Sequence, residues 1–465
     1  MKRIARALHE SCLALLATLL LVGCNTLPRM VPDMALPREP VRLEGADGRM
    51  LSAAQSRAIL ERVSAGGRET SILDRHLALE QALSDRPLTA GNRAVLLEDG
   101  PATYAAMLSA IDAARDHVNM ETYILDDDET GRRFADALIA RQRAGVQVNL
   151  IHDSVGTIGT PRAFFDRLKE AGVNVLEFNP VNPLTAKAGW DVNQRDHRKI
   201  LVVDGRIAFL GGINISSVYS GSSPGTSGQP SGSAKDLPWR DTDLQLTGPV
   251  VADLQRFFLE TWERQHGPPL AGRNYFPPLA AEGADVVRAI ASVPDDPLSP
   301  IYATFISAIN SAETEILLTN AYFVPDPQLV DALLAAVARG VDVRMVLPSA
   351  TDSWLVFHAG RAHYERLLEG GLKLYERKDA LLHAKTALID GVWSTVGSTN
   401  LDWRSFLHNQ EVNAVILGSE FGRRMRESFE RDVAASRPIT LESWQQRPLS
   451  DRLKEAFGRL WEYWL

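Results

Sequence analysis

Two parts of the chain show the same succession of hydrophobic and polar positions. In the first, residues 117–125 and 144–153 are apolar runs of strand length, and the segment between them repeats apolar residues at helical spacing. In the second, residues 315–324 and 339–348 flank a segment of the same kind. Strands that alternate with helices predict an α/β fold, in which helices cover the faces of a sheet.

The correspondence continues beyond these strands. A glycine closes the helix before the second strand in both parts, at Gly145 and Gly340. Each part then has a further helical stretch, at 161–172 and 357–371, followed by a short apolar strand. Because both the order of elements and their spacing agree, the chain is expected to contain a tandem duplication of one unit.

The strongest match between the two units is a motif that follows this short strand. The first unit reads HRKILVVDGRIAFLGGIN from His197, and the second reads HAKTALIDGVWSTVGSTN from His383. The positions that agree are His197, Lys199, Asp204 and Asn214 in the first copy and His383, Lys385, Asp390 and Asn400 in the second. One departure is Gly212, which stands where Ser398 stands in the second copy. Since alternate side chains of a strand share a face, each histidine and its lysine should point the same way.

These residue types suit chemistry at a phosphodiester. A neutral imidazole can attack phosphorus or move a proton, a lysine can neutralise phosphate oxygens, and an asparagine can donate a hydrogen bond to them. Two units that face each other would place one imidazole on each side of the phosphodiester. One histidine would attack while the other protonates the leaving alcohol and then activates an incoming alcohol or water. The duplication would therefore provide both the nucleophile and the acid/base of one reaction.

Other chemistries account less well for the motif. A single histidine on a strand is more often structural than catalytic, but two copies at matching positions argue against chance. Histidine and aspartate can ligate metals, yet the lysine beside each histidine would repel a cation, so no metal is expected. A serine hydrolase would need a G-x-S-x-G turn between a strand and a helix. The string GSSPG at 221–225 lies instead within a Ser/Gly/Pro-rich loop, 220–233.

The repeated pattern resembles the HxKxxxxD motif of the phospholipase D superfamily, over roughly residues 85–435. The resemblance implies an α/β fold of two tandem phospholipase D-like domains, each a mixed sheet flanked by helices, with the active site between them. It also implies that His197 is the nucleophile and His383 the acid/base, and that no metal or other cofactor takes part.

The resemblance further implies a role for carboxylates that follow the motifs. In the superfamily such a carboxylate orients each histidine, and the matching residues here are Asp241 and Glu411, with Asp243 competing for the first role. The aspartates of the motif are taken as structural or pKa-setting. The catalytic motif set is His197, Lys199, Asp204, His383, Lys385 and Asp390, and the phosphate-binding or supporting set is Asn214, Asn400, Ser398, Asp241 and Glu411.

Within the superfamily, the amino-acid sequence around the motifs is most similar to that of bacterial cardiolipin synthases. The stretches that carry this similarity are DHRKILVVDGRIAFLGGINI (196–215), WRDTDLQLTGPVV (239–251) and VGSTNLDWRSFLHNQEVNAVI (396–416). The similarity implies transphosphatidylation between two phospholipids through a phosphohistidine, with phosphatidylglycerol as the expected substrate. A hydrolytic phospholipase D, with water as the acceptor, would use the same residues and remains an alternative; a nuclease is less favoured.

Composition narrows the range of partners. Hydrophobic residues make up 45% and charged residues 23% of the 465 residues, as in a soluble globular protein with a sizeable core. The formal net charge of −8 argues against an extended basic face for nucleic acid. The expected partners are a phospholipid substrate and a membrane surface, with no nucleic acid, and the protein is expected to act as a monomer.

The N-terminus has the features of an export signal. A positively charged start is followed by an apolar run at 13–22, too short to span a bilayer, which ends in LVGC at Cys24. This ending resembles a bacterial lipobox, so cleavage before Cys24 and lipid attachment to its thiol are expected. The other cysteine, Cys12, lies within the signal, so no disulfide is expected. The protein is therefore predicted to be anchored on the periplasmic side of the inner or outer membrane.

The C-terminal residues form an apolar pattern of their own. Apolar residues recur at helical spacing, at Leu449, Leu453, Phe457, Leu460, Trp461, Trp464 and Leu465. A tryptophan-bearing helix of this kind suits either the bilayer interface or a place on the protein's own core. The expected organisation is a signal peptide (1–23), a tether (24–45), an N-terminal phospholipase D-like domain (46–270), a C-terminal phospholipase D-like domain (271–440) and an amphipathic helix (441–465).

Overall fold

The computed structural model describes residues 40–66, 72–83, 86–182, 184, 190–221, 237–294, 296 and 299–465. The expected signal peptide, Cys24 and most of the tether and of the Ser/Gly/Pro-rich loop lie outside these residues. No helix within the described part of the chain is long and apolar enough to cross a membrane.

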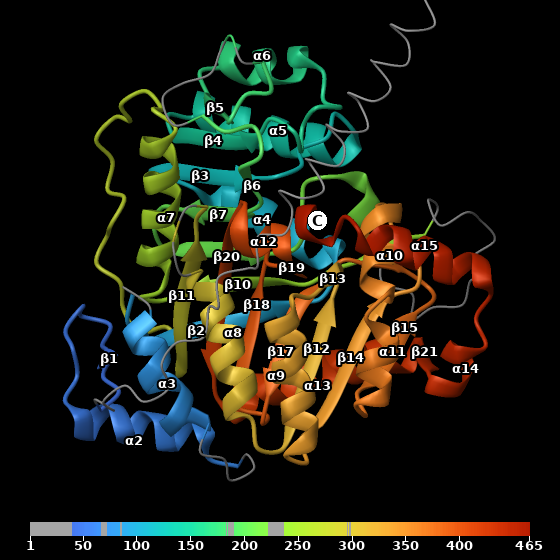
Figure 1. Cartoon of the computed structure of the whole chain (residues 1–465). Coiled ribbons are helices and arrows are strands. Elements are labelled where there is room, and N and C mark those ends of the chain that lie inside the picture. Colours follow the sequence, from blue (N-terminus) through green and yellow to red (C-terminus); the bar gives the residue numbers. More distant parts are fainter. Residues whose placement is uncertain are drawn as a thin grey trace, which may run out of the picture.

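The first unit is built on a mixed sheet (Figure 1). Across the sheet, its strands follow the order β5 (Asn174–Phe178), β4 (Gln147–Asp153), β3 (His117–Thr122), β7 (Ile200–Val203), β8 (Ile207–Gly211), β10 (Asp243–Thr247) and β2 (Leu88–Leu97). Strands β3, β4 and β5 are parallel neighbours, and the remaining neighbours in this order are antiparallel. Its helices are α4 (Gly100–Ala113), α5 (Glu129–Arg143), α6 (Arg162–Glu170) and α7 (Val251–Arg264).

The second unit repeats this order strand by strand. Its strands are β15 (Lys373–Arg377), β14 (Asp342–Pro348), β12 (Glu315–Asn320), β17 (Lys385–Ile389), β18 (Trp393–Gly397), β20 (Asn409–Leu417) and β11 (Asp285–Ser292). Its helices are α8 (Pro300–Ser311), α9 (Pro327–Ala338), α10 (Trp354–Arg361), α11 (Tyr364–Glu369) and α13 (Ser419–Ala434), and β21 (Ser436–Ile439) adds to the outer edge of β15. The predicted α/β fold with a duplicated unit is confirmed.

The two units share one core. Strand β11 pairs antiparallel with β20 of its own unit and with β2 of the other, so the sheets are continuous. A single buried cluster joins the motif-bearing strands, with Val202 of β7 and Leu246 of β10 beside Leu388 of β17 and Val412 of β20. Because this apolar burial fixes the two motif strands relative to each other, their ends are held at defined positions in the middle of the molecule.

The N-terminal elements pack against the second unit. They are β1 (Leu43–Glu44), α2 (Ala53–Ser64) and α3 (Ile72–Leu83). Helix α3 lies on α8, where His76 Nδ1 is 2.8 Å from Ser307 Oγ, and its buried Glu80 accepts a hydrogen bond from Arg288 of β11 at 2.9 Å. Helix α3 therefore precedes the first unit in the sequence but packs against the second.

Short elements complete the structure. They are β6 (Arg195–Asp196), η2 (Ser217–Tyr219), β9 (Trp239–Arg240), β13 (Phe323–Val324), β16 (Leu381–Leu382), β19 (Leu401–Asp402), α12 (Trp403–Leu407), α14 (Leu441–Gln445), α15 (Leu449–Arg459) and η4 (Glu462–Trp464). Helix α15 packs along α10, and the end of the chain returns to α12 near the middle of the molecule (Figure 1).

Candidate active site

A two-residue pairing between the units sets the position of His197. Strand β6 pairs in parallel with the start of β20, with Arg195 opposite Asn409 and Asp196 opposite Gln410. The residues that follow are His197 and Glu411. The backbone N–H of His197 donates to the Gln410 carbonyl at 3.0 Å, which carries the pairing one residue further.

A second two-residue pairing between the units sets the position of His383. Strand β9 of the first unit pairs in parallel with β16 of the second, and the residues that follow these strands are Asp241 and His383. The His383 N–H donates to the Arg240 carbonyl at 2.7 Å. Each histidine is thus brought beside a carboxylate that follows the motif of the opposite unit.

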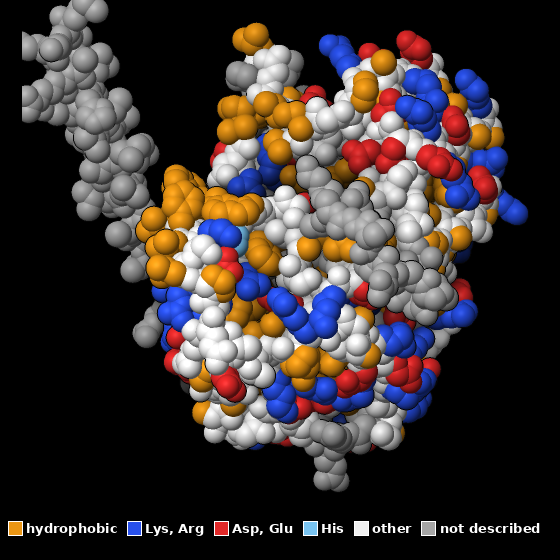
Figure 2. Space-filling model, turned by 90° about the vertical axis from the view of Figure 1, so that its right-hand side faces the viewer, with side chains coloured by type: hydrophobic (Ala, Val, Ile, Leu, Met, Phe, Trp, Pro, Cys, Tyr) orange, Lys and Arg blue, Asp and Glu red, His pale blue; other side chains and the backbone are white. Residues whose placement is uncertain are grey.

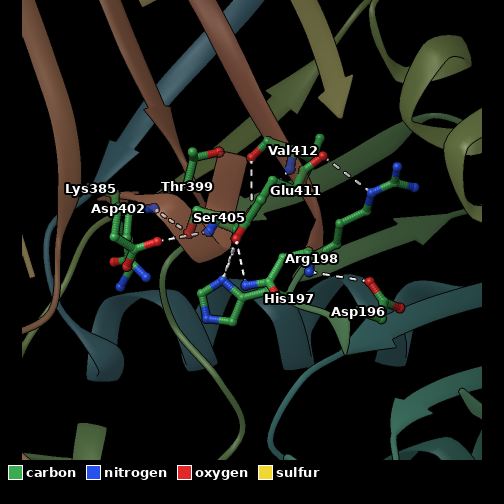
Figure 3. A network of polar contacts seen from close by, with 12 residues as sticks. Asp196, His197, Arg198, Lys385, Thr399, Asp402, Ser405, Glu411 and Val412 are labelled. Atoms are coloured by element: carbon green, nitrogen blue, oxygen red, sulfur yellow. Dashed lines mark hydrogen bonds and ion pairs between the residues drawn. The ribbon is translucent and has the colours of Figure 1, made fainter. Parts of the chain in front are cut away.

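Glu411 holds the His197 ring through two contacts. His197 Nδ1 lies 3.0 Å from Oε1 and 3.1 Å from Oε2 of Glu411, and Figure 3 shows the carboxylate facing that edge of the imidazole. Ser398 Oγ donates to Glu411 Oε2 at 2.5 Å, and Asn409 Nδ2 donates to Oε1 at 3.3 Å. The Tyr123 ring packs edge-on against the imidazole, with centroids 5.1 Å apart. The carboxylate and the ring are therefore both fixed in position.

Asp241 holds the His383 ring in the same way. His383 Nδ1 lies 2.6 Å from Asp241 Oδ2 and 3.3 Å from the Tyr219 hydroxyl. Trp239 lies beside the ring, with centroids 5.0 Å apart. Since both histidines meet their carboxylates through Nδ1, Nε2 is the nitrogen that each presents on the opposite side of its ring.

Both histidines line one cavity between the units. Its volume is about 310 Å³. The lining comprises His197 and His383, the aromatic residues Tyr123, Trp239, Tyr322 and Trp464, the polar or charged residues Arg195, Asn214, Asp352, Ser353, Asn400, Asp402, Arg404 and Asn409, and the apolar residues Ile124, Val356 and Leu465. The residues come from both units and from the C-terminus, so the site exists only in the complete fold.

The two motif asparagines line this cavity but differ in the hydrogen bonds that their side chains make. Asn214 Oδ1 accepts from the Ile124 N–H at 3.0 Å, and its Nδ2 donates to the Tyr219 hydroxyl at 3.1 Å. Asn400 is buried, and its Oδ1 has no hydrogen-bond partner among the described residues. Asn400 therefore has side-chain capacity left for a substrate, whereas Asn214 is already engaged by the protein.

Burial keeps both imidazoles neutral. Burial, with Lys199 and Lys385 nearby, holds the pKa of His197 well below its usual range. Burial and Lys385 likewise lower the pKa of His383, although Asp241 opposes this shift. A neutral imidazole carries the free electron pair that a nucleophile or a general base requires.

The groups around the imidazoles titrate close to neutral pH. Burial raises the pKa of Glu411 to about 7, against the opposing effects of Lys199 and Ser398. Burial lowers the pKa of Lys199 to about 7 and that of Lys385 to about 8. Lys199 Nζ donates to the His197 carbonyl at 2.5 Å, and Lys385 Nζ lies 2.9 Å from His383 Nδ1, so the ammonium group of each lysine lies beside its histidine. The two ammonium groups make the site suitable for an anion.

The motif aspartates are not brought to the histidines. Asp204 lies at the far end of β7, where its carboxylate accepts the backbone N–H groups of Arg115, Asp116 and His117 at 2.8–3.0 Å. Asp390 binds the segment before β12 in the same manner, through the N–H groups of residues 313–315. Because the seven residues from each histidine to its aspartate run through a strand and span roughly 20 Å, these carboxylates cannot touch a phosphate at the histidines. Both carboxylates instead bind backbone N–H groups at the far ends of β7 and β17.

The departure at Gly212 has a steric reason. A Cβ atom at Gly212 would lie 2.2 Å from Asp241 Oδ1, so a serine there would displace the carboxylate that holds His383. Its counterpart Ser398 instead donates to Glu411. The Ser398 hydroxyl therefore supports the carboxylate that holds His197.

The aromatic surroundings of the site were not foreseen from the sequence. Tyr219 and Trp239 contact His383, and Tyr322 lies 6.1 Å from it between ring centroids. Tyr123 comes directly after β3, and Tyr322 comes two residues after β12, the corresponding strand of the second unit. That shared place at a strand end was the available signal, since such ends converge on the site of an α/β sheet.

No group of three or more His, Cys, Asp or Glu side chains in the described residues could hold a metal ion.

The fold and the site together define an enzyme of the phospholipase D type. The family model described as "Cardiolipin synthase, PLD-like domain" matches residues 107–219 and 305–433. A cardiolipin synthase of Geobacillus sp. (strain WCH70) is 34% identical over 390 residues, which cover 83% of this chain and 74% of that protein. The chain belongs to the cardiolipin synthase family of phospholipase D-like proteins.

Further relatives agree with this placement. The major cardiolipin synthase ClsA of Bacillus subtilis (strain 168) is 34% identical over 376 residues, which cover 80% of this chain and 75% of the relative. The crystal structure of a phosphatidylserine synthase from Haemophilus influenzae Rd KW20 superposes with a TM-score of 0.61 at 12% identity, covering 83% of this chain and 99% of that one. The structural match shows that the fold is shared.

Proposed function

We propose that the protein is a phosphatidyltransferase that makes cardiolipin from two molecules of phosphatidylglycerol. The observation that carries this proposal is the pair of histidines on one cavity, each held through Nδ1 by a carboxylate of the opposite unit. A double displacement at phosphorus needs one nucleophile and one acid/base that also serves the second step. The names of the relatives support cardiolipin as the product.

In the first step, His197 Nε2 attacks the phosphorus of the first lipid. The bond between phosphorus and the oxygen of the terminal glycerol breaks, and protonated His383 gives its proton to that oxygen. Glycerol leaves, and a phosphatidyl group remains on His197. The negative charge of the bound phosphate favours the protonated form of His383, in the same direction as Asp241. Lys199 and Lys385 stabilise the charge that develops on the phosphate oxygens.

In the second step, His383 acts as a base. It takes the proton from a glycerol hydroxyl of the second phosphatidylglycerol, and the resulting oxygen attacks phosphorus. The bond between phosphorus and His197 breaks, which regenerates the neutral imidazole and releases cardiolipin. One phosphodiester is exchanged for another, so the reaction needs no nucleotide and no other cofactor. Water in place of the second lipid would give phosphatidic acid, the hydrolytic alternative.

The test is product analysis on phosphatidylglycerol vesicles. The protein would be compared with His197→Ala, His383→Ala and the control His266→Ala, a histidine that does not line the cavity. We expect the unsubstituted protein and His266→Ala to form cardiolipin and glycerol. We expect His197→Ala and His383→Ala to form neither product. Phosphatidic acid and glycerol would identify a hydrolase, and the absence of both products would overturn the proposal. Tandem mass spectrometry of quenched enzyme should place the phosphatidyl adduct on His197.

We also propose that the protein works from a membrane anchor. The lipobox-like ending at Cys24 supports lipid attachment and a place on the periplasmic side. Mass spectrometry of the membrane fraction should find a lipidated Cys24 as the first residue, and Cys24→Ser should abolish the modification.

Because one chain contains both histidines and both carboxylates, a monomer is sufficient for activity, and size-exclusion chromatography with light scattering tests this.

A further inference from the structure

The C-terminal helix turns its apolar face to solvent. On α15 and the residues after it, large apolar side chains are exposed, at 71% for Leu449, 63% for Leu453, 51% for Phe457, 69% for Leu460, 45% for Trp461 and 53% for Trp464. Their spacing places them on one side of the helix. A helix that packs on a protein core buries such a face, so the orientation observed here is the reverse of the usual one.

The opposite face of α15 fixes this orientation. Glu455 is buried there, and Arg447 donates to it at 2.9 Å. Gly458 faces α10 so closely that an added Cβ would lie 2.6 Å from the Ala359 nitrogen. Rotation of the helix would remove the glycine from this contact and leave the Glu455 carboxylate without its arginine, so the apolar face is held outward.

This face continues onto α10 and ends at the active-site cavity. Trp354, 50% exposed at the start of α10, lies 6.3 Å from Phe457 between ring centroids. Its neighbour Ser353 lines the cavity, as do Trp464 and Leu465. We call the exposed apolar residues of this surface the C-terminal ridge: Trp354, Leu449, Leu453, Phe457, Leu460, Trp461 and Trp464. Figure 2 shows a gathering of hydrophobic side chains at this edge of the molecule, with lysine and arginine side chains beside it.

A cavity with three arginines flanks the ridge. Its volume is about 440 Å³, and its charged lining consists of Arg447, Arg452, Arg459, Glu455 and Glu462, beside Leu460 of the ridge. Arg447 is engaged by Glu455, and Arg452 donates to a backbone carbonyl. Arg459 forms a long ion pair with Glu462, at 3.8 Å, and its side chain is 64% exposed. Exposed apolar side chains with arginines alongside are the features by which a helix lies in the surface of an anionic bilayer.

We propose that the C-terminal ridge docks the protein on an anionic lipid bilayer, with Arg452 and Arg459 at the phosphate level, and that lipids pass from there into the active-site cavity. The docking extends the proposed function, because it gives the phospholipid substrate a route to the histidines. Aromatic residues of the ridge suit the headgroup region, where one part of the ring is apolar and the other is hydrated. Trp464 of the ridge also lines the active-site cavity, so a docked molecule would face the bilayer with its active site.

The experiment measures vesicle binding without the lipid anchor. The processed chain, starting at residue 24 and carrying Cys24→Ser, would be sedimented with phosphatidylglycerol/phosphatidylcholine vesicles and with phosphatidylcholine vesicles alone. The ridge variant Leu453→Glu/Phe457→Glu should lower the partition coefficient at least tenfold. The matched control Met50→Glu/Phe276→Glu changes two side chains of similar exposure, 47% and 46%, outside the ridge and should bind like the unsubstituted protein. Arg452→Gln/Arg459→Gln should weaken binding only to the vesicles that contain phosphatidylglycerol.

A second measurement separates docking from catalysis. Turnover of a water-soluble short-chain phosphatidylglycerol should be unchanged in the ridge variant, which shows that the fold and site are intact. Equal vesicle binding by the ridge variant and the control would overturn the docking proposal while leaving the proposed function in place. A ridge variant that binds vesicles normally but converts a dimer into a monomer would assign the ridge to a second copy of the chain. Vesicle binding without any phosphatidyl transfer would support docking and overturn the function.

Discussion

His197 Nδ1 lies 3.0 Å from Glu411 Oε1, although the two residues are 214 positions apart and belong to different units. The carboxylate fixes the ring so that Nδ1 carries the proton and Nε2 is free to attack. Glu411→Gln should therefore lower kcat on phosphatidylglycerol vesicles by about 10²–10⁴-fold with the fold intact. Asp241→Asn should act similarly through His383, whereas Glu420→Gln, on an exposed helix start, should retain full activity. Retention of near-normal kcat by Glu411→Gln would refute the assigned role.

The close contact at Gly212 leads to a second prediction. Gly212→Ala should displace the Asp241 carboxylate, because the new Cβ would lie 2.2 Å from Oδ1. A flexible carboxylate can move, so stability should fall little while kcat falls by about 10²-fold or more. Gly272→Ala is the matched control, since an added Cβ there meets no atom within 4 Å. Steady-state kinetics and thermal unfolding of both variants check this; normal kcat in Gly212→Ala would contradict it.

The motif aspartates should affect stability and not chemistry. Asp204 has a positive φ of 53° and accepts three backbone N–H groups. Asp204→Ala would lose these bonds and place a less tolerant residue in the left-handed region, so the free energy of unfolding should drop by about 1–3 kcal/mol. Asp204→Asn keeps the tolerated backbone and one acceptor oxygen, so it should lose less.

Urea unfolding and kinetics on the same preparations distinguish the two roles. Both variants should keep kcat within a few-fold at a temperature where they are folded. If Asp204→Asn abolished turnover without changing the unfolding midpoint, the aspartate would have a chemical role and the anchoring assignment would fail.

The pH dependence of kcat/KM should report Glu411. Its pKa of about 7 means that the carboxylate predominates above neutral pH and is protonated as the pH falls, so activity should decline on the acidic side. On the alkaline side, loss of protons from Lys199, with a pKa of about 7, and Lys385, with a pKa of about 8, should reduce activity again.

Ser398→Ala tests this assignment directly. The Ser398 hydroxyl stabilises the charged form of Glu411, so removing it should raise that pKa and move the acidic limb to higher pH by roughly one unit. Thr399→Val is a suitable control, because the Thr399 hydroxyl binds Asn413 and not Glu411. An acidic limb that stays in place or moves to lower pH in Ser398→Ala would argue that another group controls it.

The sequence contained enough information for the duplication. Apolar runs, closing glycines and matching spacing are local signals. The His-x-Lys spacing keeps Lys199 close to His197, although β7 itself begins only at Ile200. The crossed pairing of histidines and carboxylates is not local. It depends on pairings that involve only two residues of β6 and of β16, too short to leave a hydrophobic pattern.

The C-terminal helix shows a different limit of the sequence. Its periodicity identified the apolar face but not its direction, since the same pattern suits a core and a bilayer. The direction is decided by Glu455 and Gly458, whose burial depends on Arg447 and on the backbone of α10. Neither contact can be recognised without the tertiary structure.

The crossed pairing also bears on how such a chain could arise. In a two-fold symmetric pair of identical subunits, residue i of the first subunit contacts residue j of the second, and residue j of the first contacts residue i of the second. His197 with Glu411 and His383 with Asp241 follow that rule within a single polypeptide. A single unit of this kind would need a second copy of itself to complete a site, and both imidazoles would then have identical surroundings. Within one polypeptide the two halves can differ, as Gly212 beside Asp241 and Ser398 beside Glu411 do.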